Sequence, residues 1–383
     1  MIRGRLLVAL LLGLASSVSA QTSYIGFGDS ITFGVGDDPL RTEKGYTPRL
    51  QTLLQGAGST AVVKNFGVGG EDTQQALGRI DAVLQVNAAP GDVFLLMEGT
   101  NDISRGYSIE SIRFNLNQLA QRAEARGLSV IHATTIPRLP NAKFDPQNVT
   151  NAELNQNVRD MAGFRERRLA DPNEVFSVLP NLFGTYYYTG ADDPVGHPNA
   201  AGYDVLAQTF FDVIRGVDRV PPVSGISSPK PGAKNVSASL PVQVDVWDFG
   251  QGIDLTGTTL VINGTATGIV PTGNAKRVTL TYQPATPLSG VVSVGLQSRD
   301  AATPANTVNR EIFRFTVAGT QVLQGDIDQD GRVDGTDLLR FARRFGTRRT
   351  DPLYSEVADF NGDNSIDGQD LAILASNFGK TSF

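Results

Sequence analysis

The sequence predicts an α/β domain, then an antiparallel β-sandwich, then a small pair of loop-helix units. Short apolar runs alternate with amphipathic helical runs from residue 23 to about residue 217. From there to about residue 319, only short alternating strand patterns occur. The last part contains an internal repeat, which starts at Gly325 and again at Ala358.

The first 20 residues have the composition of a secretory signal peptide. Two arginines precede an apolar run that ends in Val18-Ser19-Ala20, so cleavage is expected before Gln21. This run is too short to span a bilayer comfortably, and no later segment is apolar enough to do so. The mature protein is therefore expected to be secreted, without a membrane span.

Charge and cysteine content exclude several classes of function. The formal net charge is −6, which argues against nucleic acid as a partner. The chain has no cysteine, so it has no disulfide, cysteine nucleophile or thiolate zinc site. Metal ions or large cores must therefore stabilise the exported protein.

Residues 21–217 are expected to form the α/β domain. Four apolar segments predict buried strands, namely SYIGFG, AVVKNFG, DVFLLMEG and SVIHATTIP. Four further segments have helical spacing, namely TPRLQTLLQGAG, TQQALGRIDAVLQ, SIESIRFNLNQLAQRAEARG and NAELNQNVRDMAGFRERRLA. Repeated βα units predict a parallel sheet covered on both faces. In such sheets ligands bind beyond the carboxyl ends of the strands.

The segment GDSITFGVG places Ser30 at the carboxyl end of the first predicted strand. Asp29 or Ser30 at this point can simply cap the next helix. Alternatively Ser30 is a nucleophile, which requires a base to take its proton. Of the two histidines, His132 lies within a predicted strand, where a role in the core is expected. His197 lies in a loop directly before a helix. This loop follows the last predicted strand region and should return to the edge of the sheet where Ser30 lies, so His197 is the expected base.

Two other strand ends offer hydrogen-bond donors for the oxyanion of an acyl-transfer reaction. The glycine-rich turn at residues 67–70 can point backbone N–H groups outward, and Asn101 in GTND can donate through its amide. Either pattern alone is common in βα turns. Their occurrence together with Ser30 and His197 predicts an acyl-transfer site.

In these blocks the sequence resembles the SGNH (GDSL-type) esterases and lipases, over about residues 23–217. The matching blocks are Gly28-Asp29-Ser30, Asn65 through Gly70, GTND and His197-Pro198-Asn199. The resemblance implies a flavodoxin-like α/β fold and hydrolysis of carboxylic esters without a catalytic cofactor. It implies Ser30 as nucleophile, His197 as proton shuttle, and the Ser30 and Gly70 amides with the Asn101 side chain as oxyanion donors.

One position departs from the family pattern. The family usually has an aspartate three residues before the histidine, but this sequence has Pro194 there. Asp193 is expected to orient His197, because the additional Gly196 lets the loop turn the carboxylate toward the imidazole. Asp192 and a Ser–His dyad oriented by a backbone carbonyl are the alternatives.

Residues 218–319 begin with a change of composition at Val220-Pro221-Pro222. Short β-branched runs such as VQVDVWD, TTLVING, RVTLTYQP, SGVVSVGLQSRD and EIFRFTVAG are separated by Gly, Pro, Asn and Asp. This spacing predicts an antiparallel β-sandwich. The segment resembles the immunoglobulin-like modules of secreted bacterial enzymes, and it shows no catalytic constellation.

Residues 320–383 contain two loops with oxygen-bearing side chains at the spacing of a calcium-binding loop. The turn of each loop needs a left-handed residue, which Gly331 and Asn364 provide. The side chains, with backbone carbonyls of Arg332 and Ser365, are expected to hold two structural calcium ions. The predicted ligands are Asp326, Asp328, Asp330, Arg332, Asp334 and Asp337, then Asp359, Asn361, Asp363, Ser365, Asp367 and Asp370.

Each loop is followed by one apolar helix, and the two units resemble a dockerin, a small helical pair related to EF-hands. The resemblance implies binding of a cohesin-type scaffold. Dockerins usually accompany polysaccharide-degrading enzymes, so the expected reaction is deacetylation of a polysaccharide such as xylan. The alternatives are a lipase, lysophospholipase or thioesterase with the same chemistry, or a noncatalytic scaffold-associated binding protein.

Overall fold

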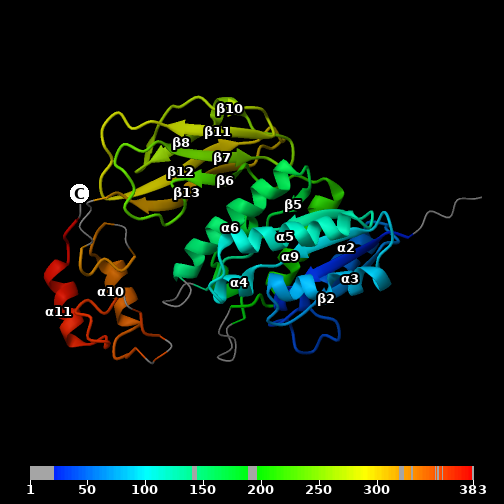
Figure 1. The fold of residues 1–383 in the computed structure, drawn as a ribbon, viewed down its shortest axis with the longest axis horizontal. Helices are drawn as coiled ribbons and strands as arrows, with labels where there is room; N and C mark the ends of the chain where they lie inside the picture. Colours follow the sequence, from blue (N-terminus) through cyan, green and yellow to red (C-terminus); the bar gives the residue numbers. More distant parts are fainter. Residues whose placement is uncertain are drawn as a thin grey trace, which may run out of the picture.

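The computed structural model describes residues 21–139, 145–188, 196–318, 323–328, 331–349, 351, 353–355 and 357–381. The expected signal peptide, Asp192, Asp193, Pro194 and Asp330 lie outside the described residues. An α/β part, a β-sandwich and a small helical part follow one another along the chain (Figure 1).

A five-stranded parallel sheet forms the centre of the α/β part, in the order β2-β1-β3-β4-β5. Its strands are β1 (Ser23–Gly28), β2 (Val62–Gly67), β3 (Val93–Met97), β4 (Ser129–Ala133) and β5 (Arg168–Ala170). This is the strand order of flavodoxin-like sheets, in which ligands bind at the switch point between β1 and β3. The predicted flavodoxin-like parallel sheet is confirmed.

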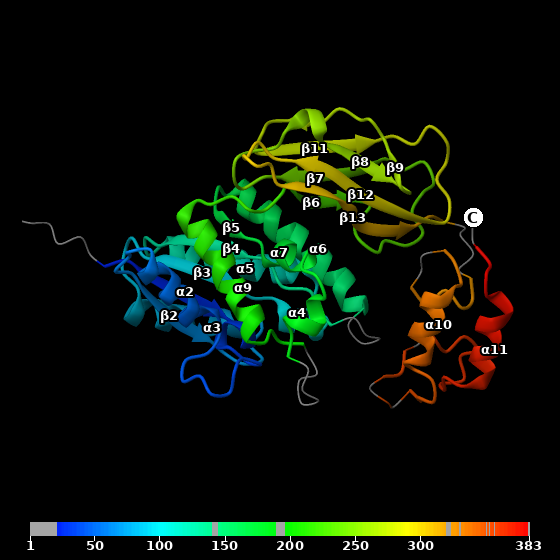
Figure 2. The same ribbon diagram turned by 180° about the vertical axis from the view of Figure 1, so that it is seen from behind.

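Helices cover both faces of this sheet. Successive side chains of a strand point to opposite sides, and in these strands apolar side chains on both sides are buried against helices. Phe94 and Leu96 of β3 join a hydrophobic cluster with α3, α5 and α6 (Figure 1), whereas Leu95 and Met97 join another with α2, α7 and α9 (Figure 2). The helices are α1 (Ser30–Phe33), α2 (Tyr46–Gly56), α3 (Thr73–Asn87), α4 (Thr100–Ser104), α5 (Ile109–Glu124), α6 (Asp145–Phe164), α7 (Pro172–Ser177), α8 (Leu182–Thr185) and α9 (Ala200–Arg215).

The prediction of one helix over residues 151–170 is wrong at its end. Helix α6 ends at Phe164, and residues 168–170 form β5 at the edge of the sheet. The chain reverses at Glu166, which has a left-handed φ of 53°. Leu169 and Ala170 are then buried as strand residues, so tertiary packing overrides the local helical pattern.

The sandwich consists of two four-stranded antiparallel sheets, in the orders β10-β11-β7-β6 and β13-β12-β8-β9. They enclose one core that contains Val244 and Leu280 from the first sheet and Leu260 and Phe315 from the second. The predicted antiparallel sandwich is confirmed, and the immunoglobulin-like topology stays a prediction. The elements are β6 (Val223–Ser228), β7 (Val242–Trp247), η1 (Leu255–Gly257), β8 (Thr259–Ile262), β9 (Thr265–Ala266), β10 (Thr272–Gly273), β11 (Arg277–Tyr282), β12 (Val291–Arg299) and β13 (Thr307–Thr316).

Helix α6 joins the α/β part to the sandwich. The indole Nε1–H of Trp247 donates to the carboxylate of Asp160, which also accepts the backbone N–H of Ile226 at 2.7 Å. A Cβ on Gly163 would lie 2.4 Å from the Trp247 ring, and one on Gly225 would lie 2.9 Å from it. The tryptophan therefore packs between two positions that tolerate only glycine.

The helical part contains α10 (Gly335–Ala342) and α11 (Gly368–Asn377). Asp334 and Asp367 cap these helices, and both form a capping box with the acid three residues later. A small core with Phe341 and Leu374 joins the two units. Among the described residues, no helix has the length and apolar character that a membrane span requires.

Candidate active site

Ser30 lies directly beyond the end of β1, at the switch point of the sheet. Asp29 caps helix α1, with its carboxylate accepting the Ile31 N–H at 2.8 Å. A Cβ on Gly28 would come within 2.3 Å of the Met97 carbonyl oxygen, so this strand end requires glycine. The turn therefore fixes Ser30 as the first residue of α1.

His197 lies against Ser30. Its Nε2 is 2.8 Å from Ser30 Oγ, and each of the two residues is only 8 % exposed. The segment is held on its other side, because the His197 carbonyl oxygen accepts the Tyr188 N–H at 2.9 Å and Pro198 forms a β-bridge with Tyr187. The structure thus brings the predicted nucleophile and base into hydrogen-bond contact.

Gly36 allows the loop after α1 to approach the histidine. Its φ is 85°, and a Cβ there would lie 2.7 Å from the Pro198 carbonyl oxygen and 3.0 Å from His197 Cβ. Any side chain at this position would therefore collide with the segment that carries the imidazole.

Hydrogen bonds join the strand-end turns that contain Gly70 and Asn101 to the Ser30 turn. The Val68 N–H donates to the Gly28 carbonyl at 2.9 Å, and Asn101 Nδ2 donates to the Glu71 carbonyl at 2.7 Å. An amide group carries two N–H donors, so the second one of Asn101 is available to a substrate. Gly70 has a left-handed φ of 73°, and its carbonyl accepts from Arg105 at 2.8 Å.

The predicted orienting acid, Asp193, and its alternative, Asp192, lie outside the described residues. The described chain resumes at Gly196, whose φ is 77°. A Cβ on Gly196 would lie 2.7 Å from the Leu139 side chain, so the glycine also permits close packing here. The choice between a triad and a dyad stays a prediction.

Two acids near Ser30 are buried, namely Asp29, which the sequence analysis considered only as a helix cap, and Glu98, which it missed. Burial raises the pKa of Asp29 to about 6, although the Ile31 N–H and His197 oppose this shift. Burial, followed by the charges of Asp29 and Glu71, raises the pKa of Glu98 well above its usual value. The sequence indicates the burial of Glu98 only by its position, because this acid directly follows the apolar run VFLLM.

His132 is a buried core residue, as expected. Burial and then the neighbouring Arg167 lower its pKa to about 3. Arg167 Nη1 lies 3.2 Å from His132 Nε2, so the imidazole is neutral and accepts this hydrogen bond. His197, and not His132, is therefore the histidine in contact with Ser30.

The first acidic loop of the helical part fits a hard cation. Asp326, Asp328 and Asp337 each offer a carboxylate oxygen, and these atoms lie within 4.8 Å of one another. Gly331 has the left-handed φ of 84° that the turn requires, and its N–H donates to Asp326 at 2.9 Å. Asp334 caps α10, and Arg332 forms a β-bridge with Thr381.

The second loop repeats this backbone arrangement. Asn364 has a φ of 70°, and its N–H donates to Asp359 at 2.8 Å. Asn361 Nδ2 donates to Asp363 at 3.0 Å. Asp370 Oδ1 accepts the Phe360 N–H at 2.7 Å, just as Asp337 accepts the Ile327 N–H. Further along, Asp367 caps α11 and Ser365 forms a β-bridge with Arg348.

Residues 27–205 match the model of the GDSL-like Lipase/Acylhydrolase family. This segment, here called the GDSL domain, is similar to that family. Residues 324–378 match the Dockerin type I domain, a type of domain that binds calcium. Both resemblances expected from the sequence are therefore confirmed.

Two curated relatives share part of the chain. A multidomain esterase of Ruminococcus flavefaciens is 26% identical over 242 residues, which are 52% of this chain and 29% of the relative. Esterase TesA of Pseudomonas aeruginosa is 33% identical over 118 residues, which are 31% of this chain and 56% of the relative. The chain therefore spans less than two thirds of the length of either relative.

A solved structure of Axe2, an acetylxylan esterase from Geobacillus stearothermophilus, is similar to half of the chain. The similarity covers 50% of this chain and 94% of that one, with 21% sequence identity and a TM-score of 0.41.

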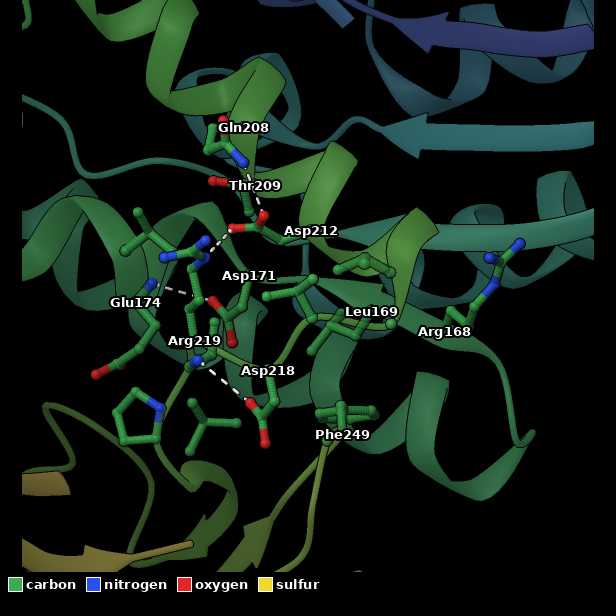
Figure 3. Close-up of a pocket in the computed structure, with 18 of the residues that line it drawn as sticks. Arg168, Leu169, Asp171, Glu174, Gln208, Thr209, Asp212, Asp218, Arg219 and Phe249 are labelled. Atoms are coloured by element: carbon green, nitrogen blue, oxygen red, sulfur yellow. Dashed lines mark hydrogen bonds and ion pairs between the residues drawn. The ribbon is translucent and has the colours of Figure 1, made fainter. Parts of the chain in front are cut away.

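The GDSL domain also borders a cavity of about 560 Å³, shown in Figure 3. It lies between β5, α7 and α9 of the domain and the loop that contains Phe249 of the sandwich. Ser30, His197 and Asn101 are not among its lining residues. This cavity is therefore separate from the Ser30–His197 pair.

Proposed function

We propose that the GDSL domain is a serine esterase that hydrolyses carboxylic ester bonds. The observation that carries the proposal is the 2.8 Å contact between Ser30 Oγ and His197 Nε2 at the carboxyl edge of the sheet. A neutral imidazole in this position accepts the hydroxyl proton and so activates the serine. Both residues are nearly buried, which strengthens electrostatic interactions in the site.

In the proposed reaction Ser30 Oγ attacks the ester carbonyl carbon while His197 Nε2 takes the hydroxyl proton. The Ser30 and Gly70 N–H groups and the free N–H of Asn101 donate to the resulting oxyanion. His197 then gives its proton to the departing alcohol oxygen. A water molecule repeats these steps on the acyl-enzyme and releases the acid. No cofactor takes part.

We assign the orientation of the imidazole to Asp193. In this case Asp193→Asn decreases kcat severely, because the substitution removes the charge that holds the imidazole in the required tautomer. Asp192→Asn, one residue earlier, is the matched control and should have a mild effect. Equal and small effects of the two substitutions would support a dyad oriented by backbone instead.

The proposed substrate is an acetylated polysaccharide such as xylan. Support comes from the dockerin match, since dockerins usually accompany polysaccharide-degrading enzymes, and from the multidomain esterase among the relatives. A lipase, lysophospholipase or thioesterase is the alternative. A panel of p-nitrophenyl esters from acetate to palmitate, run beside acetylated xylan, decides between them. Preference for long acyl chains would exclude the polysaccharide.

The remaining parts are assigned as follows. Residues 1–20 are a signal peptide that directs secretion, 21–217 the hydrolase, 218–319 an immunoglobulin-like spacer and 320–383 the dockerin. The dockerin binds two structural calcium ions through the two acidic loops and attaches the enzyme to a cohesin-type scaffold outside the cell. The close arrangement of Asp326, Asp328 and Asp337 supports this assignment.

Ser30→Ala tests the enzymatic assignment. Turnover of p-nitrophenyl acetate should disappear while the circular dichroism spectrum stays unchanged, because the substitution removes the nucleophile and little packing. His197→Ala should lose a similar amount, since members of one catalytic unit are not additive. Ser111→Ala on α5 is the control and should retain full activity. Turnover by Ser30→Ala would mean that Ser30 is not the nucleophile, and absence of turnover in the wild-type protein would support a noncatalytic binding protein instead.

A further inference from the structure

Three carboxylates meet where the linker after α9 touches two loops of the sandwich. Asp218 lies in the linker, Asp248 directly follows β7, and Asp300 directly follows β12. One oxygen from each lies within 4.8 Å of the others. Asp248 is 5 % exposed and Asp300 is 2 % exposed. The cluster thus joins two buried acids and the half-buried Asp218, and Asp218 lies far from Asp300 in the sequence.

Hydrogen bonds from the chain hold all three carboxylates in place, including those of Asp218 and Asp300. Asp218 accepts the Gln251 N–H at 2.7 Å, which ties the linker to the loop after β7. Asp300 accepts the Asn306 N–H at 2.8 Å and the Asn306 side-chain amide at 2.6 Å. A Cβ on Gly250 would lie 2.0 Å from the Asp218 carboxylate, so this loop is shaped around the acid.

Asp248 has an oxygen that the chain does not satisfy. Its Oδ1 accepts the N–H groups of Gly250 at 2.9 Å and Gly252 at 2.7 Å. Its Oδ2 is buried, and among the described residues no group donates a hydrogen bond to it. A buried carboxylate oxygen without a donor is costly, so it normally has a partner.

The two arginines that adjoin the cluster in the sequence are paired with other acids. Arg219, next to Asp218, pairs with Asp212 at 3.0 Å (Figure 3), and Arg299, next to Asp300, pairs with Asp254 at 2.7 Å. The three carboxylates therefore place like charges at short range, and these charges repel one another unless a cation binds between them.

We propose that Asp218, Asp248 and Asp300 form a calcium site that joins the hydrolase linker to the sandwich. Carboxylate oxygens on irregular loops suit calcium, which accepts six to eight oxygen ligands in flexible geometry. Magnesium demands near-ideal octahedral geometry, and zinc prefers nitrogen and sulfur ligands. The site is distinct from the two dockerin loops and is independent of the proposed esterase activity.

Calcium at this site fixes the linker against the sandwich and so stabilises one wall of the neighbouring cavity. Asp218, Phe249, Gly250 and Gln251 all line that cavity, and Figure 3 shows Asp218 and Phe249 side by side on its wall. An ion that binds only the folded arrangement adds its binding free energy to the stability of this contact.

Terbium luminescence tests the site in the full-length protein. Terbium replaces calcium on carboxylates and emits when a nearby indole transfers energy to it. The chain has one tryptophan, Trp247, adjacent to Asp248. Excitation at wavelengths that only tryptophan absorbs should therefore give terbium emission that calcium abolishes by competition. Absence of this emission in the wild-type protein would overturn the proposal.

Substitutions separate this site from the dockerin. Asp218→Asn should lose most of the tryptophan-sensitised emission and one calcium per chain by titration calorimetry. Asp218 lies outside the sandwich strands, so the variant should still fold. Glu311→Gln removes an exposed acid of β13 that pairs with Arg314 outside the cluster, and it should behave like wild type. The double variant Asp337→Asn/Asp370→Asn should keep the emission while it loses the dockerin ions. Full emission in Asp218→Asn, or its loss in the dockerin double variant, would refute the assignment.

Discussion

At the level of single residues, glycine sets how closely the backbone segments of the site approach one another. A Cβ on Gly67 would lie 2.0 Å from the Phe33 nitrogen, and one on Gly28 would lie 2.2 Å from the Thr32 hydroxyl. Gly36 plays the same part toward the histidine segment. The contact between Ser30 and His197 therefore depends on three residues that have no side chain.

Gly36→Ala should lower kcat for p-nitrophenyl acetate by roughly 10- to 100-fold, with a smaller change in KM. The new methyl group strains the left-handed backbone and pushes His197 away from Ser30. Gly78→Ala in α3 is the control, because a Cβ there meets nothing within 4 Å. It should keep full activity and raise stability by about 0.5–1 kcal/mol. Wild-type kcat in Gly36→Ala would show that the approach of this loop is unimportant.

Asn101→Ala should lower kcat by roughly 100- to 1,000-fold, the usual effect of losing one oxyanion donor. The side chain is held by its 2.7 Å bond to the Glu71 carbonyl. Asn157→Ala removes a similar side chain-to-backbone bond on α6 and serves as the control. An effect confined to KM would assign Asn101 to substrate binding.

The pairing of Ser30 with His197 was predictable because strand ends of a parallel sheet meet at one edge. To place these motifs at one edge, it is enough to know the order of strands and turns along the chain, without any knowledge of how the elements pack. The high pKa values of Asp29 and Glu98 were not predictable, since they arise from burial by residues distant in the sequence.

At the level of elements, α6 connects the hydrolase to the sandwich through one buried carboxylate. Burial raises the pKa of Asp160 to about 6, and the hydrogen bond from Trp247 only partly opposes this. The folded protein therefore holds this proton more tightly than the unfolded chain does. The contribution of Asp160 to stability is complete below about pH 4 and is lost as the pH rises through about 6.

Trp247 emission should consequently titrate in the native protein with a midpoint near pH 6, because its indole N–H donates to Asp160. Asp160→Asn should abolish this transition. Glu153→Gln, which alters another acid of α6, should keep it. A transition that persists in Asp160→Asn would have to come from a different group.

Element prediction succeeded where periodicity was strong and segments were long. Strand β1 has the bounds of the predicted segment SYIGFG, and helix α5 begins and ends within a few residues of the bounds predicted for it. β5 has three residues, while β9 and β10 have two each. Such short strands exist only because neighbouring strands pair with them, so their own sequences carry no sufficient signal.

At the level of the whole molecule, the proposed esterase site and the acidic loops lie on different hydrophobic cores. The Ser30 site rests on the two clusters of the α/β part, whereas the acidic loops surround the small core with Phe341 and Leu374. That small core depends on loops crowded with carboxylates. We expect calcium to neutralise these charges and to add its binding free energy to the folding of the dockerin.

A chelator should unfold residues from about 325 onward and abolish cohesin binding, yet leave hydrolysis of p-nitrophenyl acetate nearly unchanged. Calorimetry with and without calcium, run beside the esterase assay, measures both effects. Addition of calcium should restore the lost transition. Loss of turnover in step with unfolding would contradict this separation.

The position of Trp247 also limits how the parts of this protein can be recombined. A hydrolase cut free after α9 would expose to water the surface of α6 around Gly163 that Trp247 covers, and Glu174 would lose Arg310 as a partner. We expect such a fragment to self-associate through that surface. In chimaeric enzymes the catalyst should therefore be transplanted together with its sandwich, whereas the scaffold-binding end can be exchanged freely.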